Sequence, residues 1–181
     1  MDFSQERKKP LFVERHPDGS TSFVSINDLE SDNGKELLTP DFTEKLSSMV
    51  AYFVKHLPLK TFPSAIKFVE NKKNADDILG FTGHYDNDTR QIVVYITDRH
   101  PKDVLRTLAH ELIHCWQHEH GKLHNHSTGD PQYAQHDPQL RKMEKQAYLL
   151  GNILFRDFCD MYKHGNKDIH NKGETDTRKQ I

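Results

Sequence analysis

The sequence predicts an α+β fold with a small, mostly antiparallel sheet of about three to four strands and three long helices. Apolar residues recur at helical spacing in three long segments, and short segments with strand-like alternation lie between the first two of them. The length of 181 residues is enough for one such domain and too short for two independent cores.

Residues 1–36 are polar and are expected to form an N-terminal arm or hairpin. Two short apolar runs, at 11–13 and 23–26, are separated by the turn sequence Pro17-Asp18-Gly19. The main domain is expected to span residues 37–163. Residues 164–181 contain almost no apolar side chain, so we expect a disordered polar tail.

The first long helix is expected to begin at Pro40. Thr39 is a favourable N-cap, proline suits the first helical position, and Asp41 places an acid in the first turn. One apolar stripe follows and ends before Pro58: Phe42, Leu46, Met49, Val50, Phe53, Val54 and Leu57. We interpret this stripe as core.

Three strands are expected next. Residues 65–70 alternate and are rich in β-branched and aromatic side chains. Residues 81–86 and 91–96 flank the turn sequence Asn87-Asp88-Thr89-Arg90, which predicts a hairpin.

Two further helices are expected after the hairpin. Pro101 opens the first, which should run to about Glu119 before Gly121 stops it. A polar, irregular loop follows. Pro138 opens the second helix, and its apolar positions keep helical spacing to about Met161.

Charge and composition exclude several classes of protein. The net charge is −2 and no stretch is strongly basic, so a nucleic acid is not expected as a partner. No apolar run approaches the roughly 18 residues of a membrane span, and the N-terminus mixes charges of both signs where a secretory signal would be apolar. We therefore expect no membrane association and a cytoplasmic location. Cys115 and Cys159 are expected to be reduced thiols.

The sequence His110-Glu111-Leu112-Ile113-His114 matches the HExxH pattern and lies within the predicted helix at 101–119. On a helix, the i, i+4 spacing places both imidazoles on one face, where they can share one Zn²⁺ ion. Glu111 is rotated by about 100° from His110, so its carboxylate lies beside the open position of the metal. There it can accept a proton from zinc-bound water as the general base.

A catalytic zinc site needs a third protein ligand, and Glu144 on the last helix is the predicted one. It lies on a mainly apolar helix face, where a carboxylate is costly unless a partner pairs with it. Gly151, seven residues later on the same face, would let the two helices approach closely.

Two histidines are alternatives to Glu144. His120 has the spacing of the third histidine in the HExxHxxGxxH pattern of the metzincins, but Gln117 replaces the glycine. His136, in His136-Asp137-Pro138-Gln139-Leu140, resembles the third-ligand segment of SprT-like proteases without its glycine and aromatic residue.

The HExxH segment, followed thirty residues later by Glu144-Lys145-Gln146-Ala147, resembles the gluzincin zinc peptidases. It is most similar to the small minigluzincin type and to uncharacterised HExxH proteins of tailed phages, over about residues 91–160. The resemblance implies an active-site helix packed on the sheet, whose edge strand, within 91–96, lines the substrate cleft. It also implies that His110, His114 and Glu144 bind one zinc per chain and that Glu111 is the general base.

One position departs from the family pattern. The larger gluzincins have an acidic residue four positions after the ligand glutamate, where it orients the first histidine, and Tyr148 occupies that position here. Tyr148 could instead donate a hydrogen bond to an oxyanion.

The expected function is therefore that of a zinc metalloendopeptidase acting on a protein or peptide substrate. Two alternatives stay open: a zinc-stabilised protein-binding module without catalysis, and a SprT-like protease of DNA-bound proteins. A fourth protein ligand would favour the binding module, because it would close the site.

Overall fold

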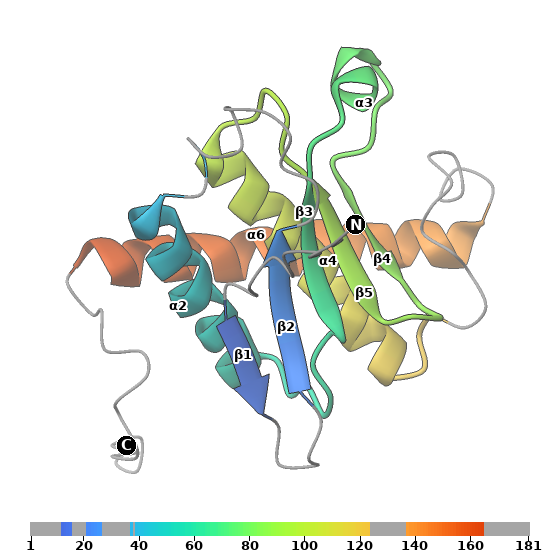
Figure 1. The fold of residues 1–181 in the computed structure, drawn as a ribbon. Coiled ribbons are helices and arrows are strands. Elements are labelled where there is room, and N and C mark those ends of the chain that lie inside the picture. The colour runs from blue at the N-terminus through green and yellow to red at the C-terminus, as the bar shows by residue number, and fades with distance from the viewer. Residues whose placement is uncertain (1–11, 16–20, 27–36, 38, 124–136, 165–181) are drawn as a thin grey trace, which may run out of the picture.

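The computed structural model describes residues 12–15, 21–26, 37, 39–123 and 137–164 (Figure 1). In chain order the elements are β1 (Phe12–Arg15), β2 (Thr21–Ile26), α2 (Pro40–His56), β3 (Ala65–Val69), α3 (Lys72–Asp76), β4 (Gly83–Asp86), β5 (Gln91–Tyr95), α4 (Pro101–Glu119) and α6 (Pro138–Lys163). The α+β class and the three long helices are confirmed. The short helix α3 was not expected from the sequence.

Within the part of the chain that the structure describes, the strands form one mixed sheet of five strands in the order β1-β2-β3-β5-β4. The two outer pairs, β1 with β2 and β4 with β5, are antiparallel, and β4 and β5 form the hairpin that was predicted for residues 81–96. The inner pairs, β2 with β3 and β3 with β5, are parallel, so the sheet is larger than expected and antiparallel only towards its two edges.

The edge strand is not the one expected. The segment 91–96 was predicted to form the edge, but β5 lies inside the sheet between β3 and β4. The edge strand next to α4 is β4, because β5 pairs with β3 on one side and with β4 on the other.

Local sequence signals explain where the long helices begin. The Thr39 side chain accepts a hydrogen bond from the backbone N–H of Phe42 ahead of α2. Asp137 does the same for Gln139 and Leu140 at the start of α6. Proline occupies the first turn of α2, α4 and α6. The expected starts at Pro40, Pro101 and Pro138 are confirmed.

Helices α2, α4 and α6 lie on one side of the sheet, behind it in the view of Figure 1. Alternate residues of β3 and β5 point into this layer and are buried: Ile66, Phe68, Ile92 and Val94. The core also includes the predicted stripe of α2, from Phe42 to Leu57. Helix α4 is the central element, because it contacts β4 and β5 as well as α6.

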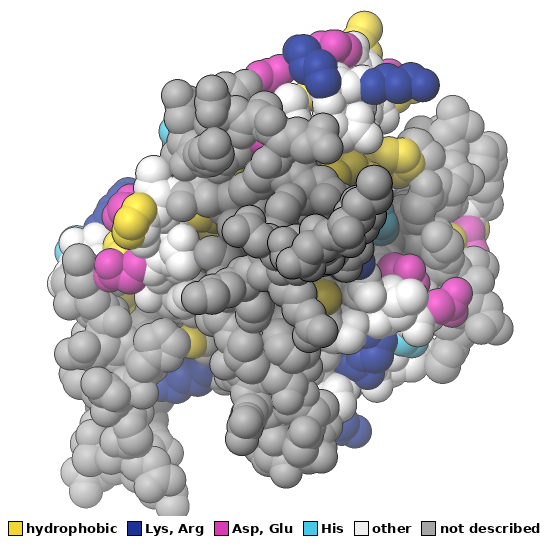
Figure 2. Space-filling model, in the orientation of Figure 1, with side chains coloured by type: hydrophobic (Ala, Val, Ile, Leu, Met, Phe, Trp, Pro, Cys, Tyr) yellow, Lys and Arg dark blue, Asp and Glu magenta, His cyan; other side chains and the backbone are white. Residues whose placement is uncertain are grey.

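Helix α3 and the turn after it project beyond the sheet. Figure 2 shows charged and hydrophobic side chains together on this projection, at the top of the view. Ile78 and Leu79 are its exposed apolar residues. Among the described residues, no helix is long and apolar enough to cross a membrane.

Candidate metal centre

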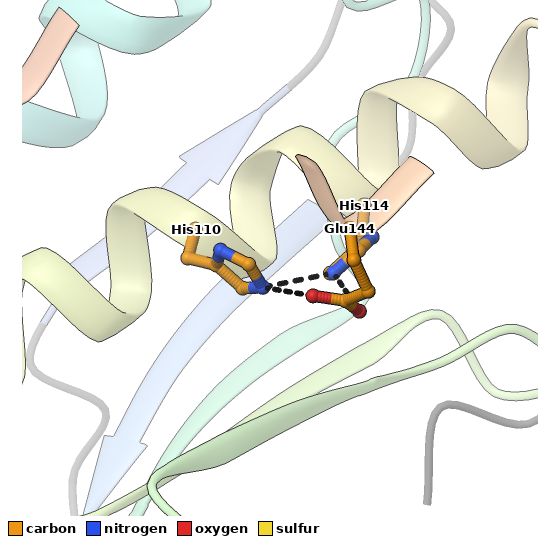
Figure 3. A group of neighbouring side chains, drawn as sticks. All are labelled: His110, His114 and Glu144. Atoms are coloured by element: carbon orange, nitrogen blue, oxygen red, sulfur yellow. Dashed lines mark hydrogen bonds and ion pairs between the residues drawn. The ribbon is translucent and has the colours of Figure 1, made fainter. Parts of the chain in front are cut away.

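Helix α4 presents His110 and His114 on consecutive turns, towards the side where α6 crosses it (Figure 3). Their ring centroids are 4.6 Å apart, and the two Nε2 atoms are 3.0 Å apart. His114 is buried, whereas 17% of the His110 side chain is exposed. Solvent therefore reaches the pair from the side of His110.

Glu144 reaches the two histidines from α6. Its Oε2 lies 3.3 Å from His110 Nε2, and its Oε1 lies 3.1 Å from His114 Nε2. The ligand atoms of the three residues all lie within 4.8 Å of one another, so His110, His114 and Glu144 could hold a metal ion. The structure thus brings together the three residues that the sequence predicted as ligands.

The donor set fits a metal ion chemically. Two imidazole nitrogens and a carboxylate oxygen are electron-pair donors, so they face one another at 3.0–3.3 Å only with a cation or a shared proton between them. Metal bonds of about 2.0 Å in a tetrahedron place neighbouring ligand atoms about 3.3 Å apart. The observed separations are close to that value.

The Glu144 carboxyl is suited to bind as an anion. Burial alone would raise its pKa, but hydrogen bonds with the His110 and His114 imidazoles outweigh burial and lower the pKa to about 2. Burial alone would lower the pKa of His114, but interactions with Glu144 and Glu111 outweigh burial and raise its pKa overall.

Glu111 lies beside the ligand group without belonging to it. Its side chain is buried under β4, where Gly83 passes so closely that an added Cβ would lie 3.4 Å from Glu111 Oε1. The backbone of Tyr85 hydrogen-bonds to the carboxylate, while Oε2 has no hydrogen-bond partner among the described residues. Burial raises the pKa of Glu111, which makes the carboxylate a better proton acceptor than an exposed glutamate.

His120, one of the two alternative third ligands, does not join this group. His120 caps the end of α4, where its Nδ1 hydrogen-bonds to the Trp116 carbonyl, and its ring lies over the Trp116 ring. The chain turns only at Gly121, which has a φ of 67°. His136 lies outside the described residues.

Tyr148, at the position where the larger gluzincins have an acidic residue, packs its ring against that of His110. The Tyr148 ring centroid lies 4.4 Å from that of His110, and 62% of Tyr148 is exposed. His110 Nδ1 is buried and has no hydrogen-bond partner among the described residues. Packing against Tyr148 therefore restricts the orientation of the His110 ring.

Two residues of the site were not identified from the sequence as contributors. Gly83 lets β4 pass over Glu111, since a Cβ there would lie 2.6 Å from Thr107 Cγ2 and 2.9 Å from the Val93 carbonyl. Gln117 hydrogen-bonds to His114. The sequence signal for this contact was the position of Gln117, which lies three residues after a ligand histidine on the same helix.

At Gly151 the backbone of α6 passes close to the backbone of α4 beside His110, as its sequence position suggested. A Cβ at this position would lie 3.3 Å from His110 Cα and 3.4 Å from the Ala109 carbonyl, which is tighter than most real contacts. A glycine here lets the backbones of α4 and α6 approach and brings Glu144 within reach of the histidines.

Replacing Gly151 with valine is expected to separate the two helices and to weaken zinc binding at least about tenfold. We also expect a loss of about 1–3 kcal/mol in the free energy of unfolding, because the branched side chain overpacks the contact. Zinc titration and chemical denaturation measure the two effects. The exposed Asn152→Val variant introduces valine one residue along the same helix and should leave zinc affinity unchanged.

No protein-family model matches the chain, and no curated protein or solved structure is significantly similar to it. The resemblance to the gluzincin peptidases therefore stays a prediction. It depends on the two sequence motifs and on the geometry around His110, His114 and Glu144.

Proposed function

We propose that this protein is a zinc-dependent metallopeptidase in which His110, His114 and Glu144 bind the metal and Glu111 is the general base. The observation that carries the proposal is the position of Glu111. Its buried carboxylate lies next to a three-residue ligand group and keeps one oxygen without a protein partner among the described residues. A purely structural metal site has no need of such a group.

Zinc is the metal that suits these ligands best. Two imidazoles and one carboxylate are a common catalytic zinc set, and three protein ligands leave one coordination position for substrate or water. When bound, zinc supplies a water of lowered pKa and polarises the substrate carbonyl. A fourth ligand would favour a binding module, but the described residues offer only these three.

Glu111 has the geometry of a proton acceptor. The Tyr85 backbone and the close packing under Gly83 hold the carboxylate in one orientation. Its Oε2 can then take a proton from the attacking water and pass it to the leaving amine.

The substrate is proposed to be an extended peptide that lies along β4. This strand is an edge of the sheet, and it contacts α4 at the residues that flank the site. Edge strands bind extended peptides through backbone hydrogen bonds, which are largely independent of sequence. In this pose the Tyr148 hydroxyl, at the open side of the site, is a candidate donor to the developing oxyanion.

The test is the zinc content per chain after extensive dialysis, combined with cleavage of a fluorogenic peptide library. We expect about one zinc in the wild type and in His136→Ala, loss of zinc in Glu144→Ala, and peptide cleavage only where zinc is held. Loss of zinc in His136→Ala instead would make His136 a ligand and favour a SprT-like enzyme. Bound zinc without any cleavage would favour a binding module.

A further inference from the structure

Gln117 is a fully buried side chain on α4, one turn after His114, and its amide hydrogen-bonds in two directions. We infer that Gln117 is a positioning residue that fixes the tautomer of His114 and joins α4 to the helix that carries Glu144. The inference rests on the proposed metal site and names the residue that prepares it for the metal.

The hydrogen bonds determine the orientation of the amide. Gln117 Nε2 donates to the backbone carbonyl of Met143 over 2.9 Å. A carbonyl only accepts, so the nitrogen must face Met143 and the oxygen must face the opposite way. Gln117 Oε1 then lies 2.9 Å from His114 Nδ1.

This orientation assigns the proton on His114. Because Gln117 Oε1 can only accept, the Nδ1 of His114 must carry the hydrogen. In the neutral imidazole the other nitrogen, Nε2, then has its lone pair available. That atom is the one facing His110 and Glu144. The amide therefore holds His114 in the tautomer that a metal ligand needs before any metal arrives.

The Gln117 amide also forms hydrogen bonds to α6. Met143 precedes Glu144 in the chain, and the Gln117 nitrogen makes a second, 3.1 Å hydrogen bond to Gln146 Oε1 on that helix. A shift of α6 that moved Glu144 away would break these bonds inside a buried region, where an unpaired polar group is costly. His110 has no comparable partner, since its Nδ1 has none among the described residues.

The experiment compares Gln117→Met with Gln146→Met. Both substitutions keep the side-chain length and remove an amide, but only the first removes the partner of His114. Nitrogen-15 NMR of the metal-free protein at alkaline pH reports the histidine tautomer, and competition with a chelating dye reports the zinc dissociation constant. For Gln117→Met we expect mixed tautomers at His114 and zinc affinity lower by about 10–100-fold. Gln146→Met should keep the Nδ1–H tautomer and stay within about threefold of wild type.

The Gln117→Glu variant distinguishes loss of the hydrogen bond to His114 from loss of the hydrogen bond to α6. Its carboxylate still accepts from His114 Nδ1–H but cannot donate to Met143, so we expect the Nδ1–H tautomer to return while the protein is less stable than wild type. Wild-type tautomer and zinc affinity in Gln117→Met would overturn the inference. Mixed tautomers at His114 in the wild type would overturn it as well. If the wild type holds no zinc, the proposed function fails, and the NMR measurement on metal-free protein still decides the role of Gln117.

Discussion

Replacing Glu111 with glutamine is expected to lower the rate of peptide hydrolysis by about 10² to 10⁴-fold while zinc stays bound. Glutamine has nearly the same shape as glutamate, so the packing under Gly83 and β4 should persist. The amide cannot accept the proton that Oε2 is placed to take. Zinc should be retained because Glu111 is not one of the three clustered ligands.

The measurement is kcat/KM on a single cleaved peptide, with zinc content determined on the same samples. Glu44→Gln is the matched control, because Glu44 is exposed on α2 and the hydrogen bond that it accepts from the Tyr162 hydroxyl, near the end of α6, can be accepted by glutamine as well. It should cleave at the wild-type rate. Unchanged hydrolysis in Glu111→Gln would remove Glu111 from the mechanism. Loss of zinc from that variant would instead assign it a part in holding the metal.

Replacing Glu119 with alanine is expected to lower the free energy of unfolding by about 2–4 kcal/mol. The Glu119 side chain is only 3% exposed and accepts hydrogen bonds from Arg90, from the backbone of Lys60 and from both the backbone and hydroxyl of Thr61. It ties the end of α4 to the loop before β3 and to the β4–β5 turn. Alanine would leave these donors without their acceptor in a largely buried region.

Chemical denaturation measures this loss, and Asp76→Ala is the control. Asp76 forms an ion pair with Lys72 in which both side chains are more than half exposed, so its removal should leave stability unchanged. A Glu119→Ala variant as stable as wild type would show that water replaces the lost acceptor.

The charge on Glu119 also predicts a pH dependence. Burial alone would raise its pKa, but the hydrogen bonds from Thr61, Arg90 and Lys60 outweigh burial and hold the pKa below its usual value. A carboxyl with a lowered folded-state pKa stabilises the protein above its unfolded-state pKa, near 4.5, and loses this contribution as the pH falls through the folded-state value. The stability difference between wild type and Glu119→Gln should therefore be constant near neutral pH and shrink below about pH 4.5. A difference that is independent of pH would show that the charge contributes nothing.

The helices and the hairpin were predictable from the sequence because their signals are local. Thr39-Pro40 and Asp137-Pro138 mark the starts of α2 and α6, and the caps form as expected. The turn at 87–90 likewise marks the hairpin of β4 and β5. Each of these signals acts between residues a few positions apart, so the chain need not be folded for them to be recognised.

The order of the strands depended on contacts between distant segments. The parallel pairing of β2 with β3 joins residues more than forty positions apart, across α2. The sequence of β5 is compatible with an edge or an interior position, and pairing with β3 makes it interior. As a result β4, and not β5, is the strand beside Glu111.

By itself, the sequence determined the HExxH helix, because the spacing of His110 and His114 and the helical period together place both imidazoles on one face. It favoured Glu144 as the third ligand and left His120 and His136 as alternatives. Tertiary structure brought Glu144 to the histidines, through the close approach of α6 at Gly151, and oriented the Gln117 amide through its hydrogen bonds to α6. The reason is physical: a helix fixes the geometry of its own side chains, but the packing of a second helix depends on every contact between the two.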